Sequence, residues 1–240
     1  MAKRTYLITG ASKGIGYATA QRLGAAGHHL IGLARTEPKG DFPGDFHTVD
    51  LSDREATAKM LENIAATHGI DGILNNVGLV HPAPLEEITL EQLDAVLDLN
   101  LRVALQTTQA ALPHMKAQGW GRIVQTSSLV TVGVPFRTSY AAAKTGLISF
   151  TRSWALELAP HAITVNAVAP GPVETELFNT NNPPGSESRQ RYIDNIPLKR
   201  TGTPDELAAI NAFLLGEDSG FITGQTVYVD GGSSIGHAAV

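Results

Sequence analysis

The sequence predicts a doubly wound α/β fold, in which helices cover both faces of a parallel sheet. Short apolar runs alternate with longer segments of helical period along the chain of 240 residues. Most of these runs are continuous aliphatic and β-branched stretches, which is typical of strands buried on both faces of a parallel sheet. A glycine-rich turn follows the first run directly. Regular alternation of strand and helix favours right-handed crossovers between parallel strands.

The pattern predicts seven strands, at 5–9, 29–34, 46–49, 72–76, 122–126, 163–169 and 226–230. Helices are expected between most of them, at 14–26, 53–67, 90–118, 138–158 and 204–215. Residues 36–45 hold two Pro and two Gly and cannot form an ordinary helix, so a loop should join the second and third strands. No linker divides the chain, and we expect one domain over 1–240.

The stretch 179–188 is the most polar and loop-like part of the sequence. It follows a predicted strand end, where mobile segments often cover a site. We therefore expect a substrate lid at about 172–200.

Composition excludes several classes of function. The net charge is −5, no basic run occurs, and aromatic residues make up 6%, which argues against a nucleic-acid partner. The absence of Cys excludes disulfides and thiolate chemistry, and the eight His show no metal-ligand spacing, so we predict no metal site. No apolar stretch reaches the roughly 18 residues of a membrane span. With no signal-peptide pattern either, we expect a cytoplasmic protein without a membrane partner.

The glycine-rich turn, TGASKGIG at 9–16, lies between the first strand and the first helix. Small residues let the backbone turn tightly and approach a pyrophosphate, while the helix N-terminus supplies N–H groups and a positive dipole end. An ordinary strand–helix turn is the alternative. The position after the first strand favours a dinucleotide site.

The end of the second strand bears on the choice of cofactor. A carboxylate there would bind the 2′-hydroxyl of the adenine ribose and repel a 2′-phosphate. This chain instead has Arg35, followed by Thr36, and Lys13 in the glycine turn can reach the same phosphate. These residues favour NADPH and disfavour NAD. The alternative is that both cations are solvated surface groups.

Tyr140 and Lys144 are four residues apart in a predicted helix and therefore project from one face. A free Tyr has a pKa near 10, and a nearby ammonium lowers that pKa by stabilising the phenolate. The Tyr hydroxyl can protonate a carbonyl oxygen as hydride reaches the carbon, and a second hydroxyl beside it would hold that oxygen. Taken alone, the pair is also compatible with a surface Tyr packed on a Lys stem.

Taken together, the motifs resemble the classical short-chain dehydrogenase/reductase family. They run in order along the whole chain: the G-x-x-x-G-x-G turn, NNVG at 75–78, Asn100, a Ser pair, YAAAK at 140–144, Asn166, PG at 170–171 and DGG at 230–232. The resemblance implies a Rossmann domain that transfers hydride between a nicotinamide and a CH–OH or C=O group. It also implies a homotetramer in which helices 90–118 and 138–158 pair with their copies and the C-terminal VDGG region forms a second contact.

The resemblance assigns roles to individual residues. Lys144 would bond the nicotinamide ribose, and Asn100 would complete a water-mediated proton relay, the alternative being an Asn that bonds neighbouring backbone. Asp50 would accept a hydrogen bond from the adenine amino group. The expected cofactor-binding residues are Gly10, Ser12, Lys13, Gly14, Ile15, Gly16, Arg35, Thr36, Asp50, Leu51, Asn76, Val77, Gly78, Tyr140, Lys144, Pro170, Gly171, Val173 and Thr175. The usual NNAG reads NNVG here, which adds bulk beside the cofactor.

The catalytic Ser is ambiguous within the pair. The family's usual spacing of thirteen residues before the Tyr selects Ser127. Alignment of the strand GRIVQTSS selects Ser128, and we prefer it because the loop 129–137 can lose a residue without moving the strand end. The pair lacks a nucleophile elbow and a His partner, which disfavours acyl transfer.

The expected function is reduction of a small-molecule ketone, or the reverse reaction, by an enzyme similar to 3-oxoacyl-[acyl-carrier-protein] reductases and small-carbonyl reductases. Alternatives are a 3-oxoacyl-[acyl-carrier-protein] reductase, an NAD-dependent alcohol dehydrogenase and a non-catalytic nucleotide sensor. The stretches QGWG (118–121) and PHA (160–162) lack the basic residues with which carrier-protein reductases tend to meet their carrier. Pocket candidates are Leu129, Val130, Pro135, Phe136, Arg137 and the segment 172–196. Arg137 is compatible with an acidic substrate or with a plain surface charge.

Overall fold

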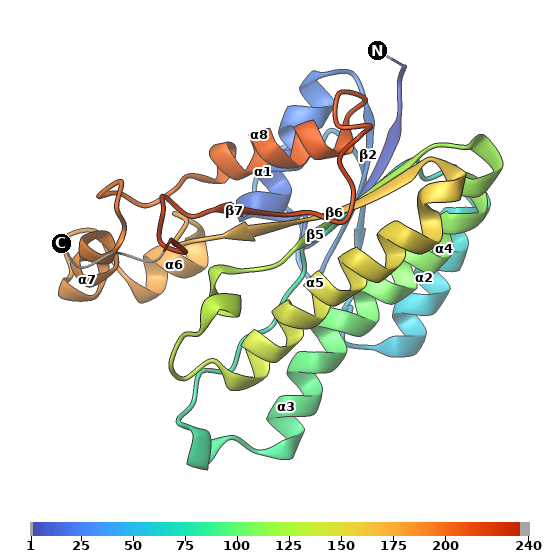
Figure 1. Ribbon diagram of the computed structural model, residues 1–240. Coiled ribbons are helices and arrows are strands. Elements are labelled where there is room, and N and C mark those ends of the chain that lie inside the picture. Colours follow the sequence, from blue (N-terminus) through green and yellow to red (C-terminus); the bar gives the residue numbers. More distant parts are fainter. Residues whose placement is uncertain (1, 236–240) are drawn as a thin grey trace.

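A seven-stranded parallel sheet in the order β3-β2-β1-β4-β5-β6-β7 forms the centre of the molecule (Figure 1). The computed structural model describes residues 2–235. The strands are β1 (Thr5–Thr9), β2 (His29–Ala34), β3 (Gly44–Thr48), β4 (Gly72–Asn75), β5 (Gly121–Thr126), β6 (Ile163–Pro170) and β7 (Thr226–Val229). This topology confirms the predicted doubly wound α/β fold. Strand order reverses between β1 and β4, and in such sheets a ligand crevice forms at that point.

Helices cover both faces of the sheet. One face carries α1 (Gly14–Ala25) and α8 (Pro204–Leu215), and the other carries α2 (Arg54–Thr67), α4 (Val103–Gln118) and α5 (Thr138–Leu158) (Figure 1). The side chains of β1 alternate between the two cores: Tyr6 and Ile8 face the cluster under α1 and α8, whereas Leu7 faces the other. This two-residue period follows from strand geometry, because successive side chains point to opposite faces.

The predicted long helix at 90–118 is interrupted. The structure has α3 (Leu90–Leu97), one π-helical turn over Asp98–Arg102, and then α4. Inside the turn, the side-chain amide of Asn100 donates to the carbonyl of Val96 at 2.8 Å, so a side chain competes with the backbone ladder. Such turns often mark functional positions inside helices.

The segment expected to form a lid contains more helix than its polarity suggested. The expectation of a loop over 179–188 is wrong at both ends, because α6 (Glu176–Asn181) and α7 (Glu187–Asn195) extend into it. Thr175 caps the N–H of Phe178 and Ser186 caps that of Arg189, and such caps start short helices even in polar sequence. By contrast, the loop expected between the second and third strands is present.

Short 3₁₀ turns complete the structure, at Leu85–Glu87, Leu129–Val132 and Ala159–His161. Within the part of the chain that the structure describes, none of the helices combines the length and apolar character needed to cross a bilayer.

Tyr6 provides a test of how the central strand is tied to α8. Its side chain is 1% exposed, and its hydroxyl donates to the carbonyl of Leu215 at 3.0 Å. Leu215 ends α8, so its carbonyl has no intrahelical partner. Tyr6→Phe should lower the free energy of unfolding by about 0.5–1.5 kcal/mol, measured by urea denaturation.

Tyr17→Phe is the matched control, because the Tyr17 hydroxyl makes an exposed bond of the same length to the carbonyl of Asp41. It should change the unfolding free energy by less than about 0.5 kcal/mol. Equal losses in the two variants would contradict the importance of the buried bond.

Candidate active site

A cavity of about 720 Å³ lies at the carboxyl ends of the central strands, where the strand order reverses. Its walls come from the start of α1, from the loops after β4, β5 and β6, from the first turn of α5 and from α6 and α7. In doubly wound sheets this crevice is the usual ligand site. The cavity is therefore the candidate active site.

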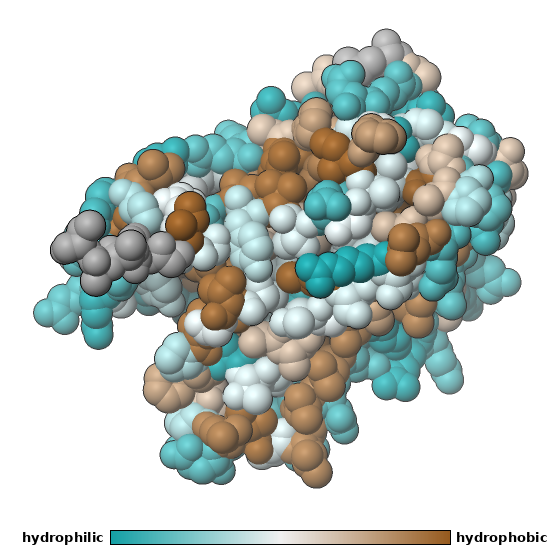
Figure 2. Space-filling model, in the orientation of Figure 1, coloured by the Kyte–Doolittle hydropathy of each residue, from teal (hydrophilic) through white to brown (hydrophobic). Residues whose placement is uncertain are grey.

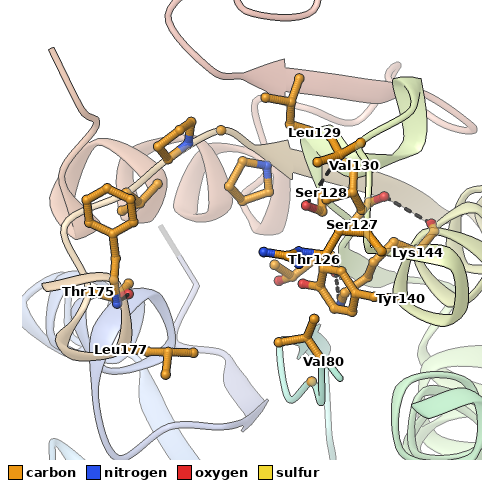
Figure 3. A pocket seen from close by; sticks show the side chains of 18 of the residues that line it. Val80, Thr126, Ser127, Ser128, Leu129, Val130, Tyr140, Lys144, Thr175 and Leu177 are labelled. Carbon is orange, nitrogen blue, oxygen red and sulfur yellow. Dashed lines mark hydrogen bonds between the residues drawn. The ribbon is translucent and has the colours of Figure 1, made fainter. Parts of the chain in front are cut away.

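Ser128 and Tyr140 lie on one wall of the cavity, with Thr175 and Leu177 across from them (Figure 3). Burial raises the pKa of Tyr140 to about 12, although the neighbouring Ser128 hydroxyl and the charge of Arg137 both act to lower it. The phenol is thus neutral at physiological pH. It can donate a proton or a hydrogen bond into the cavity.

Ser127, which also follows β5, points to the other side of the strand and makes a hydrogen bond there. Its hydroxyl donates to the carbonyl of Lys144 at 3.0 Å, and its side chain is buried (Figure 3). Successive residues of extended backbone point in opposite directions, so only one of the two Ser can face Tyr140. The structure brings Ser128 to Tyr140, whereas Ser127, which also borders the cavity, directs its hydroxyl to the backbone of α5.

Lys144 is an ammonium held almost wholly out of water. Its side chain is 2% exposed, and Nζ donates to the carbonyl of Thr126 at 2.8 Å. Burial lowers the pKa of Lys144 to about 7. Nζ lies 5.4 Å from the centre of the Tyr140 ring. The expectation that Lys144 lowers the pKa of Tyr140 is therefore not met in this arrangement, because Nζ is directed at Thr126 and burial dominates the phenol.

Asn100 lies behind Lys144 in the π turn and is buried. Its amide nitrogen donates to the carbonyls of Val96 and Leu79, so Asn100 does bond neighbouring backbone. Its side-chain oxygen has no partner within the described residues. A Cβ on Gly78 would lie 2.9 Å from that oxygen and 3.4 Å from Nζ of Lys144, so both atoms flank the same point.

The glycine turn is built for close backbone contacts. Gly10 and Gly14 adopt positive φ angles of 67° and 58°, which favour glycine. A Cβ on Gly16 would lie 2.4 Å from the carbonyl oxygen of Gly10. α1 also begins without a side-chain cap, whereas α2, α3, α6, α7 and α8 each have one. An uncapped helix start beside a tight turn fits a pyrophosphate, so the residues present fit a dinucleotide.

The cations expected at the adenine ribose lie outside the cavity. Arg35 and Thr36 are exposed at the end of β2. Lys13 Nζ is 3.6 Å from a carboxylate oxygen of Glu176, the first residue of α6, and Lys39 Nζ is 3.0 Å from the other oxygen. Sequence reasoning missed Lys39 and Glu176, because no motif links positions so far apart in the chain.

Asp50 and Leu51, which the resemblance places beside the adenine, also make contacts within the protein. The N–H and hydroxyl of Ser52 hold the pKa of Asp50 below its usual value, with a smaller contribution from the charge of Arg35. One carboxylate oxygen of Asp50 is thus already occupied. Leu51 is buried in the core, and its carbonyl accepts from Arg102 at 2.7 Å.

The structure separates the predicted site residues into two groups. Those that line the cavity are Ile15, Asn76, Gly78, Ser128, Tyr140, Lys144, Pro170, Gly171, Val173 and Thr175. The remainder lie beyond it: Gly10, Ser12, Lys13, Gly14, Gly16, Arg35, Thr36, Asp50, Leu51, Val77 and Asn100. Of the pocket candidates, Leu129, Val130 and Arg137 line the cavity and Pro135 and Phe136 do not. Val80 and Val134 also line it and were not predicted.

One cluster of potential metal ligands occurs among the described residues, formed by His29, Asp45 and His68. It lies at the amino-terminal ends of β2 and β3, at the opposite edge of the sheet from the cavity. Asp45 contacts His29 Nε2 at 3.1 Å and His68 Nε2 at 3.5 Å, and the two rings stack. These contacts account for the cluster without an ion, and its members carry no sequence spacing that would have predicted it.

Known proteins resemble this chain along most of its length. A family model described as enoyl-(acyl carrier protein) reductase matches residues 10–234. The 3-oxoacyl-[acyl-carrier-protein] reductase FabG of Thermotoga maritima is 37% identical, over 94% of this chain and 96% of the relative.

Solved structures agree with this similarity. A candidate NAD(P)-dependent gluconate 5-dehydrogenase from Beutenbergia cavernae, with NADP bound at low occupancy, superposes with a TM-score of 0.90 at 33% identity and 97% coverage of both chains. The protein ElxO with NADP bound gives 0.89 at 28% identity, covering 97% of this chain and 99% of its own. The chain belongs to the short-chain dehydrogenase/reductase family and is an NAD(P)-dependent enzyme that acts on CH–OH or C=O groups.

Proposed function

We propose that the protein reduces a ketone to an alcohol with NADPH and that Tyr140 is the proton donor. The observation that carries this proposal is the meeting of Ser128, Tyr140 and Lys144 in one cavity, next to a glycine turn that fits a dinucleotide. The neutral state of Tyr140, whose pKa is about 12, suits the reductive direction because reduction consumes a proton.

In the proposed reaction, the ketone oxygen accepts hydrogen bonds from the hydroxyls of Ser128 and Tyr140. Bound nicotinamide would supply the hydride, and with it both electrons, to the carbonyl carbon. As negative charge develops on the oxygen, the O–H bond of Tyr140 breaks and its proton moves to that oxygen, which gives the alcohol. Lys144 and Asn100, which flank Gly78 behind the phenol, are placed to return a proton to Tyr140 through water.

Three cations support NADPH as the cofactor. Lys13, Lys39 and Arg35 lie around the glycine turn and the end of β2, where the adenine ribose is bound in dinucleotide folds. Three of the solved relatives contain NADP. Lys13 is paired with Glu176, so a 2′-phosphate must compete with that carboxylate.

A 3-oxoacyl-[acyl-carrier-protein] reductase is the second candidate, because that name belongs to a relative that aligns over nearly the whole chain. Its chemistry at Ser128 and Tyr140 would be the same. The two candidates differ in whether the ketone arrives on a carrier thioester or as a free small molecule.

We also propose that the protein acts as a cytoplasmic homotetramer. Apolar side chains gather on the surface over α8 and the loop that follows it (Figure 2). Phe213 and Phe221 are exposed in this region, and Leu105 and Leu156 are exposed on α4 and α5. Exposed apolar side chains of this kind support the proposed contacts between subunits.

Turnover of NADPH with a panel of ketones, diketones, aldehydes and 3-oxoacyl thioesters tests the proposed reaction. Tyr140→Phe should lower kcat by about 10²–10⁴-fold, because it removes the proton donor and little else. Cofactor oxidation measured by absorbance gives both rates. Full activity in Tyr140→Phe would refute the assigned mechanism, and absence of turnover with every substrate would refute the proposed reaction.

The Ser pair provides a matched control for this experiment. Ser128→Ala should lower kcat by about 10²-fold, because a donor to the developing oxyanion is lost. Ser127→Ala should lower kcat much less, because the Ser127 hydroxyl bonds the carbonyl of Lys144. The reverse order of effects would show that the spacing of thirteen residues identifies the catalytic Ser.

Cofactor selectivity should depend on Lys13 and Arg35. Lys13→Ala combined with Arg35→Asp should shift the ratio of kcat/KM values from NADPH toward NADH by about 10²–10⁴-fold, because two charge-assisted hydrogen bonds are lost. Lys59→Ala, which removes an exposed cation from α2, is the control and should leave the ratio unchanged. An unchanged ratio in the double variant would refute the assignment.

The buried amine of Lys144 should lower the unfolding free energy of the protein relative to an apolar side chain at the same position. Its pKa is about 7 in the folded chain against 10.5 for the free group, so the unfolded chain binds more protons between these values. The contribution of Lys144 to stability therefore becomes more favourable as the pH rises from about 7 to 10.5 and stays at its least favourable below pH 7. Lys144→Met should raise the unfolding free energy by about 1–3 kcal/mol at pH 7 and by less as the pH approaches 10.

Urea unfolding at several pH values measures this difference, and the same variant should lose its turnover. A variant that is less stable than the natural protein at every pH would contradict the cost assigned to the buried ammonium.

A further inference from the structure

Arg137 is a charged side chain of the cavity that the proposed proton transfer does not use. It directly precedes α5, and Tyr140 follows three residues later, so both side chains leave the same end of one helix. The charge of Arg137 acts on Tyr140, lowering its pKa against the larger effect of burial. The guanidinium therefore lies within electrostatic reach of the reacting oxygen.

The charge of Arg137 lacks a protein counter-ion in the part of the chain that the structure describes. The cavity is lined by two cations, Arg137 and Lys144, and none of its described lining residues is acidic. The guanidinium donates to the backbone carbonyl of Phe136 at 3.1 Å. Arg189 in the neighbouring α7 differs, because it is paired with the carboxylate of Glu174. An uncompensated cation on an acid-free wall favours an anionic ligand.

The backbone before Arg137 is held in an unfavourable conformation. Phe136 has a φ of 62°, in the left-handed region that a bulky residue rarely adopts, at a cost of about 1–3 kcal/mol. Its ring is 59% exposed, so burial does not compensate for this cost. The Phe136 carbonyl accepts from the N–H of Ala83 at 3.3 Å, and the Arg137 carbonyl accepts from that of Ala141 at 2.7 Å. These bonds fix the position from which Arg137 reaches the cavity.

We propose that Arg137 binds a carboxylate of the substrate, so that the ketone reduced at Ser128 and Tyr140 is a short oxo acid. This inference rests on the proposed ketone reduction. A guanidinium matches a carboxylate with two parallel hydrogen bonds, and the uncapped start of α5 adds positive potential at the same place. Arg137 precedes Tyr140 by three residues and both line the same cavity, which favours a substrate whose carboxylate and ketone are close together.

Paired substrates test the proposal. The value of kcat/KM is measured for 2-oxo, 3-oxo and 4-oxo acids and for their methyl esters, which keep the ketone and lose the charge. In Arg137→Gln, kcat/KM for the preferred acid should fall about 10–100-fold while that for its ester changes less than about twofold. Arg137→Lys should retain part of the preference for the acid. Arg152→Gln, which removes an exposed cation of the same helix outside the cavity, should leave both values unchanged.

A binding measurement separates this proposal from the proposed reaction. Hydroxybutanoates and their amides are titrated calorimetrically into the protein with NADPH. If carboxylates bind more tightly than amides and lose this advantage in Arg137→Gln, the carboxylate site stands, even if no ketone is turned over and the proposed reaction fails.

Three results would overturn the carboxylate site. The first is equal affinity for carboxylates and amides, and the second is an equal loss of kcat/KM for acid and ester in Arg137→Gln. The third is a loss confined to acetoacetyl coenzyme A, with neutral acetoacetyl N-acetylcysteamine and the free acids unaffected. That result would identify the bound anion as a coenzyme phosphate.

Discussion

The burial of the Lys144 ammonium is the constraint on which the active-site region depends. A cation that is 2% exposed, with a backbone carbonyl as its hydrogen-bond partner, needs a rigid surrounding that keeps water out. The end of β5 supplies the carbonyl of Thr126, and Ser127 ties the backbone of α5 to the same strand. Gly78 leaves the space in front of Nζ open, because any Cβ there would fill it. The end of β5, helix α5 and the loop at Gly78 are thus all positioned around the buried charge of Lys144.

The sequence was informative wherever function requires a local pattern. Apolar runs predicted the sheet, and the glycine turn and the Tyr140–Lys144 spacing predicted which loops and helix would form the cavity walls. These features depend on residues close together in the chain. The left-handed backbone conformation of Phe136 and the ion pairs of Glu176 depend instead on tertiary contacts, so no local sequence pattern predicts them. The side chain of Asn100 at the helix break bonds both a local carbonyl, of Val96, and the carbonyl of Leu79 in a distant loop, and only the first contact is local in sequence.

The two halves of the predicted cofactor site differ in character. Around Tyr140 the walls are buried, and burial decides both pKa values there. Around Arg35 the groups are exposed and their charges are paired or solvated. Exposed ion pairs contribute little to stability, so this half is free to vary in charge without disturbing the fold. The sequence prediction of cofactor preference therefore rests on the part of the site that the fold constrains least.

Glu176 connects the cations expected to meet the cofactor with the helix that begins beside the cavity. The carboxylate of Glu176 is close to the ammonium groups of both Lys13 and Lys39. Glu176 is also the first residue of α6, and the two residues that follow it line the cavity. A phosphate that binds these cations must compete with the Glu176 carboxylate, although the start of α6 itself stays capped by Thr175. Because one anion replaces another, this exchange changes few net ion pairs, and added salt should weaken both states alike. One carboxylate thus sits between the cations expected to meet the cofactor and the residues of α6 that line the cavity.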